Sequence, residues 1–447
     1  MKLIYLLLLI TFLKADDLSF SQAWQMLQSS DYSLKQKSIA IERKKDMKDA
    51  TTSLYLPQIT FNAEYAYIDK PVSLDLLDLN PMRDITTELS ALGVHLDDSE
   101  FTTDLSKQHI LTSTIDLKWA LFTGFKREAV VDIAKYEVLE AVSQKELEKD
   151  KLFFELVELY YGVVMLEELH VTLQSIENSA KQHYENAKLM LKEGQVAKIE
   201  VLSAKVLYAD ATTATKKIYY DLKSARDALN IVLKDDIEGL TSKIFMKDVI
   251  NAFGSYQSKM LQNSQALKAV NSKIEQAESN VRLKEGSYYP EVFAFGNKFL
   301  YKDNSIMMGF VPDWSVGVGV KFDIVDVSGR SSQVQAANKL LLEASSFRSS
   351  IKEDLLMACN KIYNDTLSDI DEYNNLLSTI ELAKENYKLR ADGFKNGMQT
   401  SNDVNDALSL LSQAMSKRNL VSYSFIKNYS MLLILSSSID DFEGLRL

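Results

Sequence analysis

The segment Lys151–Ile176, KLFFELVELYYGVVMLEELHVTLQSI, decides the fold, and it belongs to a longer run from Lys126 to Glu193. That run contains no proline and only one glycine, Gly162, so nothing in it forces a helix to break. Its apolar residues recur at a mean spacing of about 3.4 positions, which is typical of a coiled-coil seam. The seam consists of Leu152, Leu156, Leu159, Val163, Leu166, Leu169, Leu173 and Ile176. Such a helix would extend for roughly 100 Å, so we expect a rod at about 125–193 with partner helices beside it.

A second run without glycine or proline extends from Arg330 to Asp392 and predicts a second long helix at about 330–393. Each rod ends at a glycine turn, Gly194 in KEGQVAKIEVLSA and Gly397 in KNGMQTSNDVNDA. Shorter helices are expected after these turns, at about 196–234 and about 400–436. The seam of the second rod consists of Leu355, Ala358, Ile362, Thr366, Ile370, Tyr373, Leu377 and Ile380.

Composition argues against some classes of function. The chain has 447 residues, a formal charge of −11 at pH 7 and no basic tract. Nucleic acid is therefore a poor candidate partner, because its binding is dominated by contacts between cationic side chains and phosphates. The single cysteine, Cys359, allows no disulfide within the chain, and its place in the middle of a rod predicts a buried structural thiol.

The N-terminal segment MKLIYLLLLITFLKA has the features of a secretory signal peptide. Lys2 precedes an apolar stretch, Leu3–Leu13, that is too short to span a bilayer, and LKA is an acceptable cleavage site. We therefore expect residues 1–15 to be a signal peptide rather than a buried helix. No later apolar run is long enough for a transmembrane helix, so the exported chain would be periplasmic, secreted, or in the outer membrane as a barrel.

The hydrophobic period changes from helix to strand in four segments. Alternation of apolar and polar residues predicts strands at about 58–68, 111–122, 291–301 and 314–324. In the third segment, one face carries Phe293, Phe295, Phe299 and Tyr301, with Asn297 as an exception. The segment 69–108 contains Pro71 and Pro81 and no sustained period, so we expect a long loop there.

The chain is internally duplicated. The segment SLYLPQITFNAEYAY in the first half corresponds to GSYYPEVFAFGNKFLY in the second. In the same way, STIDLKWALFTGFKR corresponds to SVGVGVKFDIVDVSGR. We place the first structural repeat at residues 16–254, ending in a link at 235–254, and the second at residues 255–447, ending in a C-terminal tail. Each repeat has the order helix, strand, loop, strand, long helix, turn, shorter helix.

The strands are typical of outer-membrane barrels, and a soluble sandwich is the alternative. Their polar faces carry charged residues suited to a water-filled interior: Glu64, Asp116, Lys118, Lys321 and Asp323. Four strands cannot close a barrel, and lipid tolerates no unpaired strand edge, so several chains must share one barrel. Three chains would supply twelve strands, enough for a channel.

In these features the chain resembles the TolC-type outer membrane efflux proteins (outer membrane factors) along nearly its whole mature length. The resemblance rests on the strand entries YLPQI and YYPEV, the strand-to-helix turns LFTGFKR and DVSGR, and the two glycine tips. It implies a mixed α/β, mostly α membrane protein that forms a homotrimer. Four strands per chain would build a twelve-stranded β-barrel, continued by a long α-helical coiled-coil tunnel. A belt of small helices would lie near residues 235–254 and both termini.

The resemblance also implies a location and partners. The protein would lie in the outer membrane lipid with a large periplasmic part. It would be the passive exit duct of a tripartite efflux or type I secretion system, docking a periplasmic adaptor (membrane fusion) protein and an inner-membrane pump. The cargo, whether drugs, metal ions or secreted proteins, is not fixed by the sequence, because specificity lies mainly in the pump.

Two carboxylates mark the expected periplasmic mouth. Asp403 and Asp406 stand where the family lines its mouth, and residues three apart share a helix face. A trimer would place six such carboxylates around one constriction, which attracts cations. The alternative is that both are ordinary solvated residues.

The family closes its mouth with a Tyr and an Arg near the second tip, and here Phe394 and Gln399 occupy those positions. These contacts therefore cannot be assumed in this chain. Glu200 on the first tip matches the family's acidic partner, but the Tyr and Arg that would bond to the first tip are missing. The remaining candidates for adaptor docking and gating lie at the turns: Gly194, Gln195, Val196, Gly397, Met398 and Thr400. Ordinary helix-hairpin chemistry explains the two glycines equally well.

Nothing in the sequence suggests an enzyme, a cofactor or a metal site. The four histidines lack metal-ligand spacing, and we expect His170 and His183 to be solvated on the first rod. GVGV at Gly317 lies within a strand and is not a phosphate loop. The rival to a duct is a soluble periplasmic coiled-coil protein with a structural or adaptor role.

Overall fold

The computed structural model describes residues 18–75, 80–94, 102–237 and 239–445, so the expected signal peptide lies outside the described residues. The described chain is mostly helical and contains a four-stranded sheet, as the fold class predicts. It divides into two compact units. The helical unit comprises the residues up to Glu42, Leu139–Ser272 and those from Ser345, and the sheet unit comprises Arg43–Val138 and Lys273–Ala344.

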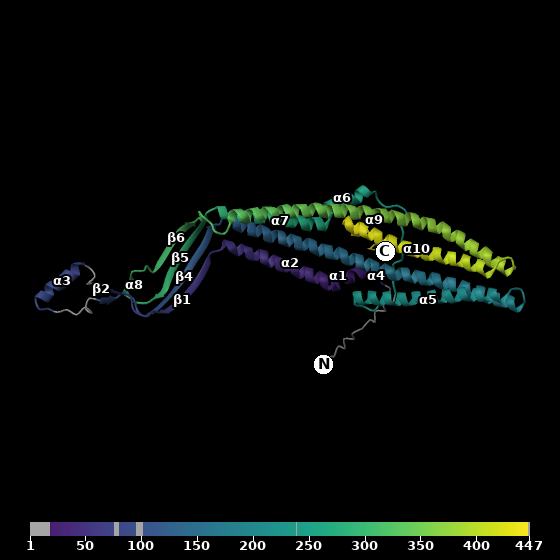
Figure 1. The fold of residues 1–447 in the computed structure, drawn as a ribbon, viewed down its shortest axis with the longest axis horizontal. Helices are drawn as coiled ribbons and strands as arrows, with labels where there is room; N and C mark the ends of the chain where they lie inside the picture. The colour runs from purple at the N-terminus through teal and green to yellow at the C-terminus, as the bar shows by residue number, and fades with distance from the viewer. Residues whose placement is uncertain (1–17, 76–79, 95–101, 238, 446–447) are drawn as a thin grey trace, which may run out of the picture. The chain divides into compact units, whose positions relative to one another are not determined.

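Two helical hairpins make up most of the helical unit (Figure 1). In the first, α4 (Lys126–Lys192) is followed by α5 (Lys198–Leu233), and in the second, α9 (Arg330–Lys395) is followed by α10 (Ser401–Leu435). Arg226 of α5 pairs with Glu167 of α4 at 2.6 Å. Lys427 of α10 pairs with Glu158 of α4 at 3.0 Å, so α4 contacts both shorter helices.

Most of the expected seam of the first rod is buried, and Leu159, Leu166 and Leu173 are partly buried. Leu156 and Val163 have no exposed surface, and Ile176 is 6 % exposed. In the second rod the seam is shifted at one point, because Leu376 is buried while Leu377 is 46 % exposed. Apolar residues that recur at intervals shorter than 3.6 residues form a stripe that drifts around a straight helix. This drift explains the shift from Leu377 to Leu376. Cys359 is fully buried, and burial raises the pKa of its thiol, which confirms the expected structural cysteine.

An aromatic cluster forms the centre of the helical unit. Phe20 makes edge-to-face contacts with Phe153 at 5.6 Å and with Tyr160 at 5.4 Å between ring centroids. The Tyr160 hydroxyl donates to the Leu18 carbonyl at 2.6 Å and accepts from the Ser242 backbone N–H at 3.2 Å. The N-terminal segment and the link between the repeats are therefore both fixed to the same part of α4.

The remaining helices are shorter. They include α1 (Phe20–Ser30), α2 (Tyr32–Thr51), α6 (Phe253–Asn263) and α7 (Gln265–Glu285), with 3-10 turns at Thr52–Tyr55, Gly286–Tyr288, Ile439–Asp441 and Glu443–Leu445. Small helices were expected near 235–254, but the described residues of this link form none before α6 begins at Phe253. Instead, Leu18 pairs with Leu240 as an isolated bridge.

The four-stranded sheet has the order β1-β4-β5-β6 and is antiparallel throughout. Its strands are β1 (Gln58–Tyr67), β4 (His109–Phe122), β5 (Glu291–Lys302) and β6 (Trp314–Lys321). The central pair, β4 and β5, joins the two halves of the chain. β6 ends three residues before the expected 324. Within the described residues, β1 and β6 are the edges of this sheet.

The register corrects the expected face of β5. Phe295 pairs with Gly317 and Phe293 with Gly319, so these rings lie on the face that carries Lys118 rather than on the apolar face of β6. A Cβ at either glycine would stand 2.6 Å from the facing ring, so only glycine leaves room for the phenylalanines. Alternation within one strand does not fix its register, and Asn297 is therefore an ordinary member of this polar face.

The segment 69–108 is not simply a loop. It contains β2 (Ser73–Asp75) paired with β3 (Thr102–Asp104), and α3 (Asn80–Ala91). Pro81, which suggested a loop, lies in the first turn of α3, where proline is tolerated. The two strands are too short for alternation to reveal them. A four-residue helix, α8 (Ile306–Gly309), lies between β5 and β6.

Among the helices that the structure describes, we find none with both the length and the apolar character that crossing a membrane requires.

Candidate functional site

The two hairpin tips have the same backbone geometry. At the end of α4, Gly194 has φ +73°, and its N–H donates to Leu191 while the next N–H donates to Met190. At the end of α9, Gly397 also has φ +73° and makes the equivalent bonds to Phe394 and Gly393. This is the Schellman arrangement, in which a left-handed residue closes the helix, and it explains both glycines.

A capping box starts α10 and engages one of the two expected mouth carboxylates. The Asp403 carboxylate accepts from the Thr400 backbone N–H at 2.9 Å and from the Thr400 hydroxyl at 2.7 Å. The Thr400 hydroxyl in turn accepts from the Asp403 N–H at 3.2 Å. Thr400 is therefore a helix cap, which its residue type alone suggests.

Arg390 completes this network and was not singled out from the sequence. Its guanidinium pairs with Asp403 at 3.3 Å and donates to the Gln399 side chain at 2.6 Å. The bonds from Thr400, followed by the charge of Arg390, lower the pKa of the Asp403 carboxyl. Asp406 is exposed and makes no ion pair with any residue in the described ranges. The two carboxylates thus differ, since only Asp403 is held by a cation of its own chain.

Glu200 joins the two tips. Its carboxylate accepts from the backbone N–H of Ser401, the first residue of α10, at 2.6 Å. One turn further along α5, the Ser203 hydroxyl donates to Asn402 at 2.5 Å and accepts from the Asn405 side chain at 2.9 Å. We call Glu200, Ser203, Ser401, Asn402 and Asn405 the tip clasp. Glu200 therefore has a donor, but it is a backbone group that residue types do not reveal.

Phe394 and His183 fill the core beneath the tips. Phe394 is 1 % exposed and His183 is 4 % exposed, and their rings meet edge to face at 4.7 Å. Burial lowers the pKa of His183 to about 4, against the opposing charge of Glu200. The expectation that His183 is solvated is wrong. Phe394 is inaccessible to a partner in this conformation, so it stabilises the tip rather than offering a docking contact.

The outer surface of the tips carries the other expected docking residues. Met398 is 71 % exposed, and Gln195 is exposed while Val196 is half-buried against the core. Two apolar side chains at the start of α5 were missed, Ile199 at 65 % and Leu202 at 47 % exposure. Their spacing of three residues places both side chains on one face of the helix after the glycine turn, and this could have identified them from the sequence. In the part of the chain that the structure describes, no group of acidic, histidine or cysteine side chains is arranged to hold a metal ion.

Comparison with known proteins identifies the fold and the family. The sequence profile of the outer membrane efflux proteins matches residues 23–233 and 257–433. Among solved structures, CusC has 11 % identity and a TM-score of 0.78, covering 94 % of this chain and 92 % of its own. VceC of Vibrio cholerae has 12 % identity and a TM-score of 0.75, covering 94 % and 96 %. The CmeC outer membrane channel of Campylobacter jejuni has 13 % identity and a TM-score of 0.74, covering 96 % and 90 %. No curated protein sequence matches.

Proposed function

Because the chain belongs to the outer membrane efflux protein family and is an efflux duct, we propose that three copies form one channel and serve as the passive exit of a tripartite efflux or type I secretion system. The match of the family profile to both halves of the chain carries this proposal. The soluble coiled-coil alternative has no observation in its favour.

The sheet supports assembly in the outer membrane. Apolar side chains stand exposed on one of its faces, including Phe61 at 64 % and Val316 at 73 %. Within the described residues, β1 and β6 have edges that no strand of the same chain covers. Neighbouring copies would pair with both edges and close a barrel of twelve strands, with the helical units extending into the periplasm.

We place the periplasmic mouth at the tips. In the trimer, Asp403 and Asp406 would contribute six carboxylates, and the free Asp406 would carry most of the negative potential because Arg390 already neutralises Asp403. The exposed Gln195 and Met398, with Ile199 and Leu202 beside them, would dock the periplasmic adaptor, which in turn engages an inner-membrane pump.

Planar-bilayer recording of the purified protein tests this function. We expect discrete current steps with a preference for cations and block by a multivalent cation such as hexamminecobalt. Asp406→Ala should relieve the block more than Asp403→Ala. Glu185→Ala removes an exposed acidic residue that pairs with Lys188 at 3.1 Å, and it should leave the block unchanged. A water-soluble monomer, or a folded trimer without conductance, would contradict the proposal.

A further inference from the structure

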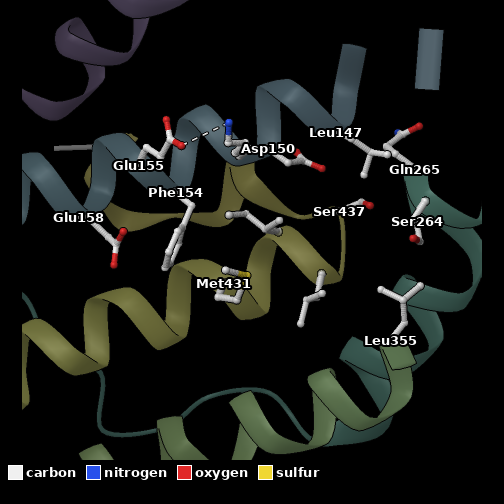
Figure 2. A pocket seen from close by; sticks show the side chains of 14 residues that line it. Leu147, Asp150, Phe154, Glu155, Glu158, Ser264, Gln265, Leu355, Met431 and Ser437 are labelled. Carbon is white, nitrogen blue, oxygen red and sulfur yellow. Dashed lines mark ion pairs between the residues drawn. The ribbon is translucent and has the colours of Figure 1, made fainter. Parts of the chain in front are cut away.

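A cavity of about 420 Å³ lies within the helical unit, where the end of α10 approaches the start of α7 (Figure 2). Four helices supply its walls: α4, α7, α9 and α10. The volume falls in the range of pockets that accept small organic molecules. Both neighbouring helix ends have partners within the chain. The Ser436 N–H donates to the Leu432 carbonyl at the end of α10, and the Leu267 N–H donates to the Ser264 hydroxyl at the start of α7.

The body of the cavity is apolar. Phe154 extends from α4 toward α10, where Met431 faces it (Figure 2). Leu355 of α9 and Ile434 of α10 add aliphatic surface, and Ala266 is the smallest side chain of the wall. A ligand that filled this space would remove apolar area from water on both sides, which is the main source of affinity in such sites.

One carboxyl group in this wall, that of Asp150, has no ion-pair partner among the described residues. Glu155 pairs with Lys151 at 3.6 Å, and Glu158 pairs with Lys427 at 3.0 Å. Asp150 is half-buried and makes no ion pair or hydrogen bond with any residue in the described ranges. Burial, with the charge of Glu146, raises the pKa of the Asp150 carboxyl to about 7 against the opposing charge of Lys149. A half-buried carboxylate without a partner is costly, and a cation placed beside it would remove that cost.

We propose that this cavity binds an amphipathic organic cation, with its ammonium group against Asp150 and its apolar body against Phe154, Leu355 and Met431. The cavity meets the three requirements of such a ligand: apolar walls, one carboxyl group without an ion-pair partner, and room for a small aromatic molecule. The site is distinct from the tips and does not depend on their role in docking or ion selection.

Isothermal titration calorimetry of the purified full chain, in its native oligomeric state, tests the proposal with two probes. Phenylbutylammonium carries the charge and the ring, while phenylbutanol has nearly the same shape without the charge. We expect the ammonium probe to bind about tenfold more tightly, the contrast expected for a charge-assisted hydrogen bond. A protein-free titration in the same detergent corrects for partitioning of the probes.

Three variants separate the contributions. Asp150→Asn keeps the shape of the side chain and should bring the two probes to equal affinity. Ala266→Phe fills the cavity and should abolish binding of both probes. Glu185→Gln makes the same change in net charge on α4 outside the cavity, and it should leave the preference intact. If Asp150→Asn retained the preference, or Ala266→Phe bound both probes normally, the site would not exist as described.

Discussion

Removing the Glu200 carboxylate should loosen the first turn of α10. In Glu200→Ala the backbone N–H of Ser401 loses the acceptor that now lies 2.6 Å away, and Ser401 has no exposed surface through which water could replace it. A buried donor left without a partner costs about 1–3 kcal/mol. We therefore expect the free energy of local opening at this turn to fall by about 2 kcal/mol, which corresponds to roughly thirty-fold faster hydrogen exchange.

The assay is hydrogen–deuterium exchange with mass spectrometry, following a peptide that contains Ser401 and comparing it with a peptide from the middle of α4. Glu200→Gln keeps a weaker, uncharged acceptor and should give an intermediate rate. Glu185→Ala removes an exposed acidic residue near the same tip, and its surface ion pair contributes at most about 1 kcal/mol, so the rate at Ser401 should not change. Unchanged exchange at Ser401 in Glu200→Ala would refute the reasoning.

Arg390→Gln should strengthen multivalent-cation block in bilayer recordings, because Asp403 loses its cation at 3.3 Å and gains free negative charge; weaker block would contradict this. Phe394→Ala should lower the free energy of unfolding by about 3–5 kcal/mol, measured by chemical denaturation, since it empties a fully buried site. His183 should make stability depend on pH. Its folded pKa of about 4 lies below the usual 6.5, so its contribution is full above pH 6.5 and is lost as the pH falls toward 4. The midpoint temperature of thermal unfolding should therefore change less between pH 6.5 and pH 4 in His183→Gln than in the wild type.

The long helices were predictable because apolar residues recur at helical spacing many times along each run. The turns were predictable because a backbone with positive φ favours glycine. The fold class and the family followed from the order of these patterns. The face of β5 was not predictable, because Phe293 and Phe295 satisfy alternation on either face and only pairing with Gly319 and Gly317 decides between them.

At the tips, the residue types indicated where function lies but not how the groups are connected. Thr400 and Asp403 could be recognised as neighbours in sequence, but the contact between Arg390 and Asp403 needs the hairpin geometry. The bond from Ser401 to Glu200 uses a backbone donor, which every residue but proline has. The burial of His183 depends on Phe394, a residue far away in sequence.

The pairing of β4 with β5 has a consequence for biogenesis. All of α4 and α5 lies between these strands in sequence, so a nascent chain presents β4 long before its partner has been synthesised. During that interval β1 covers one edge of β4, and the other edge, which β5 will occupy, is unpaired. Strands with unpaired edges are prone to aggregate. The newly made chain should therefore depend on chaperones that shield the β1–β4 pair until β5 has been synthesised.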